Sequence, residues 1–176
     1  MTKLVVLTGS ARPNSAGDKL LPIIDSAVKK HDDVELEIVH VADLNLPFFN
    51  APMPPSAEGY EPTDANVIAW SEKIKAADAV IWLMPEYNHL MTGVQKNAID
   101  WLYGEWKDKP LGLLGYGFYE GKHTIEAAKH VIDVIKPDLR VEAGLRMMEH
   151  IQPDGTAIQE DEVASRIQTV VDKVVA

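Results

Sequence analysis

The chain has 176 residues, of which 46% are hydrophobic and 25% are charged, and its formal net charge is −10. This length fits one domain, residues 1–176, with a sizeable core. The absence of cysteine excludes a disulfide framework and a thiolate nucleophile, and the acidic balance disfavours nucleic acid or an anionic membrane surface as a partner.

Short apolar runs alternate with amphipathic segments in the first part of the chain. Residues 3–9 are predicted to form a buried strand, and apolar residues at helical spacing from Leu20 to Val28 predict a helix. Residues 34–41 alternate apolar and polar side chains, which is typical of an edge strand. The proline-rich residues 43–62 predict a long loop, and loops of this length are often functional.

The rest of the chain continues this alternation. Thr63 or Asp64 can cap a helix whose apolar face runs from Val67 to Ala77. The later predicted elements are a central strand over residues 79–84, a helix over 92–103, a strand over 111–117, a helix around 125–135, a short strand over 139–143 and a closing helix over 163–174.

Alternation of five strands with five helices predicts an α/β fold, with a parallel sheet between helices on both faces. In such sheets ligands bind at the carboxyl ends of the strands, near the switch in strand order. Three loops of unusual composition fall at that edge, residues 9–15, 85–89 and 115–124. These loops are therefore the candidate site.

The first of these loops reads GSARPNS. Gly9 allows a tight exit from the strand, and Ser10, Asn14 and Ser15 offer short hydrogen-bonding groups. The guanidinium of Arg12 suits a phosphate, and the free N–H groups of the following helix point at the same place. The loop is either a phosphate cradle or a capped turn with a surface arginine. The P-loop pattern is absent, and the strand–helix turn lacks GxGxxG.

The second loop reads PEYN, with Pro85, Glu86, Tyr87 and Asn88 in a row. Together with a GSxRxxS loop after the first strand and the segment GVQKNAIDW at residues 93–101, it makes the chain similar to the NADPH-dependent FMN reductase family. The similarity covers about the first 120 residues. It implies a flavodoxin-like three-layer sandwich, with a five-stranded parallel sheet in the order 2-1-3-4-5.

The resemblance also implies how FMN is held. Ser10, Arg12 and Ser15, with Asn14 in the same loop, would bind the 5′-phosphate. Pro85, Glu86, Tyr87 and Asn88 would pass along the isoalloxazine ring. The residues Gly115, Tyr116 and Gly117 would approach the pyrimidine side of that ring.

The third loop departs from the Ser-x-Gly-Gly pattern of the family, because bulky aromatics enter it. Phe118 or Tyr119 would cover the flavin or narrow the substrate entrance, or would merely pack the loop. For Glu86 an acid–base role and a role in holding backbone amides are both open, and the second is favoured. Lys122 and the start of the following helix are candidates to stabilise reduced flavin.

The activity that the resemblance implies is FMN-dependent oxidation of NADPH or NADH, by ping-pong kinetics, with a small-molecule electron acceptor such as a quinone, an azo compound or a flavin. No catalytic side chain is assigned, because FMN carries the redox step. The alternatives are a flavodoxin-like electron carrier and a non-redox relative that lost FMN.

The resemblance further implies a homodimer or homotetramer, in which residues 45–62 complete the neighbour's substrate pocket. Trp82, Trp101, Tyr103 and Trp106 either mark an interface or pack in the core. The six histidines, among them His123 and His130 seven apart, show no ligand spacing, so no metal site is predicted. No apolar stretch has the length of a membrane span or the form of a signal peptide, so a cytoplasmic protein is expected.

Overall fold

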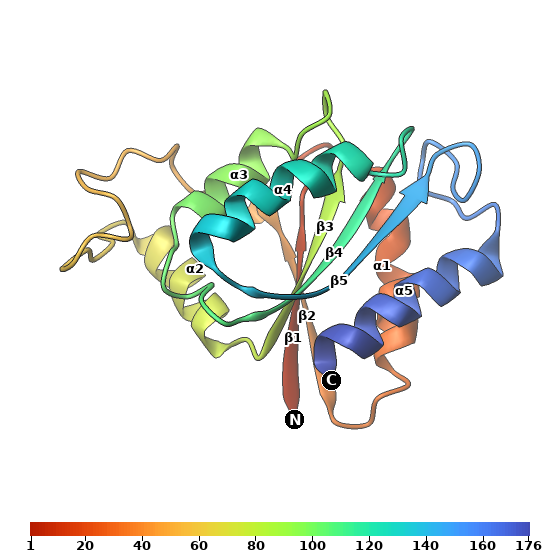
Figure 1. The fold of residues 1–176 in the computed structure, drawn as a ribbon, viewed down its shortest axis with the longest axis horizontal. Coiled ribbons are helices and arrows are strands. Elements are labelled where there is room, and N and C mark those ends of the chain that lie inside the picture. The colour runs from red at the N-terminus through yellow and green to blue at the C-terminus, as the bar shows by residue number, and fades with distance from the viewer.

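The computed structural model describes residues 1–176 and contains a five-stranded parallel sheet in the order β2-β1-β3-β4-β5 (Figure 1). This is the predicted strand order and fold class. The strands are β1 (Thr2–Thr8), β2 (Val34–His40), β3 (Ala79–Pro85), β4 (Pro110–Gly117) and β5 (Asp138–Arg146).

Helices cover both faces of the sheet, which gives three layers (Figure 1). One face carries α1 (Ala16–Val28) and α5 (Glu160–Val175), and the other carries α2 (Ala65–Ala76), α3 (Gly93–Asp100) and α4 (Lys122–Ile135). A 3-10 helix, η1 (Val41–Leu44), follows β2. None of the helices has both the length and the apolar character needed to cross a bilayer.

The pleat of the central strands divides the apolar side chains between two cores. In β1, Val5 and Leu7 pack toward α2, α3 and α4, whereas Leu4 and Val6 pack toward α1 and α5. Every residue of β3 is buried, because helices cover both of its faces. The edge strand β2 is mostly half-exposed, as its alternating sequence predicts.

The structure decides between the two predicted caps of α2, and two other element ends differ from the prediction. Asp64 caps α2, and its Oδ1 accepts hydrogen bonds from the backbone N–H of Asn66 at 2.9 Å and of Val67 at 3.2 Å. Helix α3 ends at Asp100 rather than at Tyr103, because Trp101 ends the helix and turns into the core. Strand β5 extends to Arg146, since it pairs with β4 along the whole length of that strand.

The tryptophans lie in the core rather than on a surface. Trp82 and Trp106 are fully buried, their ring centroids 5.5 Å apart at 90°, and Trp106 also meets Trp70 at 6.1 Å. Trp101 is 4% exposed, and Tyr103 is half-buried. Of the two interpretations of these residues, core packing is therefore the one that holds for the tryptophans.

Candidate functional site

A depression of about 500 Å³ opens at the carboxyl edge of the sheet, where β1, β3 and β4 end. This volume is typical of a site for a cofactor-sized ligand. Of the predicted site residues, all except Gly115 line it: Ser10, Arg12, Asn14, Ser15, Pro85, Glu86, Tyr87, Asn88, Tyr116 and Gly117. The three predicted loops therefore meet in one place.

The first loop forms a turn with polar groups directed at the depression. The hydroxyl oxygen of Ser10 lies 3.2 Å from that of Tyr87 and accepts a hydrogen bond from the Arg12 backbone N–H at 3.2 Å. Ser15 caps α1, and its N–H donates to Asp18 at 2.8 Å. The Arg12 side chain is exposed and forms no ion pair with a carboxylate of the chain. The loop thus presents an unpaired cation beside a helix N-terminus.

The second loop is a tight two-residue turn. Asn88 and His89 have left-handed φ values of 51° and 68°, and Tyr87 and Leu90 exchange backbone hydrogen bonds at 2.9 and 3.0 Å. Asn and His adopt this conformation more readily than most residues. The turn places the partly exposed Tyr87 ring beside the GSARPNS loop. The contact between the Tyr87 hydroxyl and Ser10 joins the two loops.

Glu86 is half-buried, and its Oε2 accepts a hydrogen bond from the backbone N–H of His123 at 3.1 Å. The carboxylate therefore holds a backbone amide, which is the role that the sequence favoured. This contact also occupies the N-terminus of α4. Lys122 lies 3.7 Å from Glu120, and neither it nor another residue of the first turn of α4 lines the depression.

Tyr116 and Gly115 face opposite sides of β4. The Tyr116 hydroxyl reaches α1 and lies 2.8 Å from the point where a Cβ on Gly17 would stand. Burial raises the pKa of Tyr116 far above its usual value, against the opposing effect of Ser15 and Gly17, so the phenol stays protonated. Gly115 instead packs against Gly121, with a would-be Cβ 3.0 Å from the Gly121 carbonyl oxygen. Gly115 therefore does not line the depression, unlike the other predicted site residues.

The two aromatic side chains of the third loop have different surroundings. Phe118 lines the depression and is 64% exposed, whereas Tyr119 does not line it and packs against His89 at 5.4 Å and His123 at 5.3 Å between ring centroids. Only Phe118 is placed to cover a ligand. Ala16, Met147 and Pro153 also line the depression, and the sequence prediction did not include them. The carboxyl end of the fifth strand was the available signal for Met147 and Pro153, but that strand was expected to end earlier.

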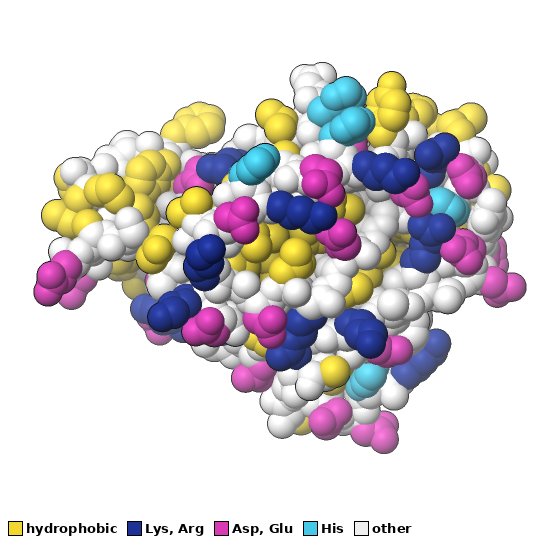
Figure 2. All heavy atoms as spheres, in the orientation of Figure 1, with side chains coloured by type: hydrophobic (Ala, Val, Ile, Leu, Met, Phe, Trp, Pro, Cys, Tyr) yellow, Lys and Arg dark blue, Asp and Glu magenta, His cyan; other side chains and the backbone are white.

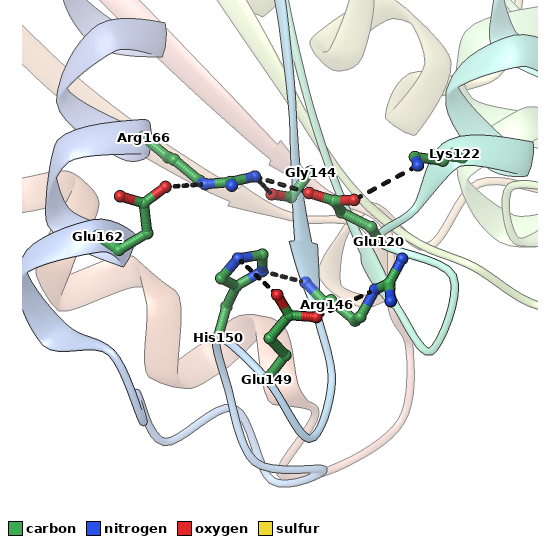
Figure 3. A network of polar contacts seen from close by, with 8 residues as sticks. All are labelled: Glu120, Lys122, Gly144, Arg146, Glu149, His150, Glu162 and Arg166. Atoms are coloured by element: carbon green, nitrogen blue, oxygen red, sulfur yellow. Dashed lines mark hydrogen bonds and ion pairs between the residues drawn. The ribbon is translucent and has the colours of Figure 1, made fainter.

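A network of ion pairs holds the third loop against α5 (Figure 3). Arg166 of α5 donates to Glu120 at 2.7 Å and to the carbonyl oxygen of Gly144 at 3.0 Å. Burial would raise the pKa of Glu120, but the hydrogen bond and charge of Arg166, with smaller effects of Lys122 and His150, outweigh it and lower this pKa. Glu120 therefore ties the loop to α5 in its ionised form.

Replacing Glu120 with glutamine is expected to lower the free energy of unfolding at neutral pH by about 1–2 kcal/mol, because a half-buried charge-assisted hydrogen bond to Arg166 is lost. Since folding lowers the pKa of Glu120, this stability is fully present above its ordinary value of 4.5 and disappears as pH falls through the lowered value. Urea unfolding at pH 7 and at a series of lower pH values measures the difference between wild type and variant.

The matched control is Glu162→Gln. Glu162 accepts from the Nε atom of the same Arg166 at 2.6 Å, but as an exposed i, i+4 pair on α5. Such pairs contribute about 0.3–0.5 kcal/mol. An equal effect of the two substitutions at pH 7, or a Glu120→Gln effect that does not shrink as the pH is lowered from 7 into the acid range, would contradict the assignment.

A second depression, of about 550 Å³, lies under the proline-rich loop. The carbonyl oxygen of Pro47 accepts hydrogen bonds from Trp101 Nε1 at 2.8 Å and from Asn97 Nδ2 at 2.9 Å, which fastens the start of this loop to α3. The second depression is lined by residues of this loop and by Trp101, and no arginine or lysine lines it. It is therefore poorly suited to a phosphate.

The chain is similar to known oxidoreductases. Residues 2–140 match the NADPH-dependent FMN reductase family. The chain is 32% identical over 130 residues to an NAD(P)H-dependent FMN reductase of Nectria sp, which covers 70% of this chain and 64% of the relative. It is 34% identical over 125 residues to an NAD(P)H:quinone oxidoreductase of Solanum tuberosum. That alignment covers 68% of this chain and 62% of the relative. Both alignments thus span less than two thirds of the relatives' own length.

The solved structure of the flavoenzyme NAD(P)H:(acceptor) oxidoreductase FerB from Paracoccus denitrificans has a TM-score of 0.74 to this chain. Sequence identity in that comparison is 25%, and the match covers 99% of this chain and 97% of the other. The family match extends over most of the chain and includes all three loops that meet at the depression. The chain therefore belongs to the NADPH-dependent FMN reductase family of oxidoreductases.

Proposed function

We propose that the protein is an FMN-dependent NAD(P)H oxidoreductase that reduces a quinone, an azo compound, a flavin or a similar small acceptor. The observation that carries the proposal is the meeting of the GSARPNS and PEYN loops in one depression of cofactor size. The relatives named above as FMN reductase and quinone oxidoreductase support the choice of reductant and acceptor classes.

The residues of the first loop fit a phosphate. Arg12 offers a guanidinium that no carboxylate of the chain neutralises, beside the first-turn N–H groups of α1. Ser10 and Ser15 are buried side chains at the bottom of the same depression. In a chain of net charge −10, a concave site built around an unpaired arginine indicates a local anion ligand.

The residues of the other loops fit a flat ring. Pro85, Tyr87, Gly117 and Phe118 line the depression and present apolar surface to it. Gly117 packs closely against Glu86, since a Cβ at Gly117 would lie 3.0 Å from the Glu86 Cβ atom. These residues would bind and orient the ring and exclude water from it.

FMN, when bound, supplies the redox chemistry by taking electrons from NAD(P)H and passing them to the acceptor. The chain's own titratable groups in the depression are consistent with a positioning role. The Glu86 carboxylate holds the His123 amide, and burial raises the pKa of Tyr116, so that its phenol stays protonated. With both substrates reaching the flavin through this depression, ping-pong kinetics would follow.

The test is a visible spectrum of the purified protein with and without added FMN, followed by anaerobic addition of NADPH and then of a quinone. We expect a bound-flavin spectrum that bleaches rapidly and returns with the quinone. A bound spectrum that NADPH leaves unchanged would instead indicate a carrier reduced by another protein. Failure to bind excess FMN would show that the fold is kept without the activity.

We also infer that the protein self-associates through the proline-rich loop. This loop projects from the body of the molecule (Figure 1), and Figure 2 shows hydrophobic side chains gathered on the projection at the left of the view. Phe48 is 84% exposed, and Phe49 and Met53 beside it are also exposed. Light scattering is expected to give a dimer or larger species, and Phe48→Ser is expected to shift it toward the monomer. A fully active monomeric wild type would contradict the inference.

A further inference from the structure

Three side chains of types that bind metal ions lie close together beside the depression, and one of them comes from another element. Glu86, His89 and His123 each offer one ligand atom, and these atoms all lie within 4.8 Å of one another. Glu86 and His89 come from the turn after β3, and His123 comes from the first turn of α4. Figure 2 shows histidine side chains gathered at the surface at the top of the view, over this turn.

The two imidazoles lie face to face. The ring centroids of His89 and His123 are 3.9 Å apart with an interplanar angle of 26°, and Tyr119 packs edge-on against both. Both histidines are exposed, and neither ring forms a hydrogen bond or ion pair with another residue of the chain. Their nitrogen atoms are therefore free to take a ligand.

Glu86 is the fixed member of the group. Its Oε2 is held by the backbone N–H of His123, which ties the carboxylate to the same helix turn that carries the imidazole. In metal sites, hydrogen bonds of this kind to the ligating groups hold them in orientation. The two histidines are exposed and can rotate about their side-chain bonds to bring the ligand atoms to the ~3.3 Å separation of tetrahedral zinc ligands.

We propose that Glu86, His89 and His123 form a binding site for a divalent transition-metal ion of the zinc type. Two imidazoles and one carboxylate are a ligand set suited to Zn²⁺, Ni²⁺ or Cu²⁺, whereas Mg²⁺ and Ca²⁺ require more oxygen ligands. Three protein ligands on an exposed rim leave further coordination positions open to water. A bound ion would join the turn after β3 to the start of α4.

The experiment is a calorimetric titration of Zn²⁺ into the full chain, purified without an oligohistidine tag and in a buffer that does not chelate zinc. We expect one ion per chain and a higher midpoint of thermal unfolding when zinc is present. His89→Asn keeps the left-handed turn, since asparagine tolerates that conformation, and removes one ligand. This variant and His123→Ala are each expected to weaken binding by at least about tenfold.

The matched control is His130→Ala, which removes an exposed histidine from the same helix, away from the group. It is expected to bind zinc as the wild type does. Circular dichroism of each variant without metal establishes that it is folded. The proposal is overturned if the wild type binds no zinc, or if the double variant His89→Asn/His123→Ala binds it as tightly as the wild type. Neither outcome depends on FMN or on turnover, so failure here leaves the proposed function standing.

Discussion

Replacing Arg12 with alanine is expected to weaken FMN binding by roughly 10- to 100-fold, the loss of one charge-assisted interaction with the phosphate. The structure shows no carboxylate partner for this guanidinium, so the substitution removes no ion pair within the protein. Stability of the flavin-free chain should therefore change little. A fluorescence titration with FMN measures the dissociation constant, because bound flavin fluorescence differs from that of free flavin.

Riboflavin separates a phosphate effect from a general loss of the site, because it carries the same ring without the phosphate. Arg12→Ala should leave the riboflavin dissociation constant unchanged, and Arg12→Lys should give an intermediate FMN constant, since lysine keeps the charge but not the bidentate geometry. Lys107→Ala is the matched control. It removes one positive charge in the exposed connection before β4, at the opposite edge of the sheet. Equal losses for FMN and riboflavin in Arg12→Ala would contradict the phosphate assignment.

The sheet was predictable because its signals are local. The apolar run of β3 and the alternation of β2 each follow from whether one or both faces of the strand are covered, and that pattern can be read without knowing the neighbours. The site loops were predictable for a related reason, since the carboxyl ends of parallel strands share one edge. Topology brings the three loops to that edge, and ten of the residues that the family resemblance pointed to within them line the depression.

The features that were missed depend on tertiary packing. The end of α3 is decided by Trp101 turning into the core, although its apolar pattern continues past Asp100. The orientation of Tyr116 depends on the space left by Gly17, a residue much earlier in the chain. His123 was compared with His130 along the same helix, but the structure stacks it on His89 from another loop. Sequence spacing within one element could not find that pair.

Replacing Gly155 with alanine is expected to lower the free energy of unfolding by about 2–5 kcal/mol, a larger loss than that expected for Glu120→Gln. Gly155 is buried with a φ of +89°, which L side chains rarely adopt. An added Cβ would also stand 2.1 Å from the carbonyl oxygen of Ala16. Left-handed strain costs about 1–2 kcal/mol and a backbone clash about 1–3 kcal/mol, and in this position both act together.

The same substitution tests how the proposed phosphate site is supported. Ala16 is the first residue of α1 and lines the depression, so relief of the clash must move either this helix start or the segment that contains Pro153. Because Pro153 also lines the depression, both movements reach the site. We therefore expect FMN affinity to fall by roughly tenfold even at temperatures where the variant is folded, which corresponds to one lost hydrogen bond to a charged group.

Gly59→Ala provides the comparison that isolates the clash. Gly59 also has a positive φ, +78°, but no atom lies within 4 Å of its would-be Cβ position. This variant should lose only about 1–2 kcal/mol, the cost of the left-handed conformation, and should keep the wild-type FMN affinity. Thermal unfolding and FMN titration of the two variants form one experiment. If Gly155→Ala is no less stable than Gly59→Ala, Ala16 moves freely and the start of α1 is not held by the loop after β5.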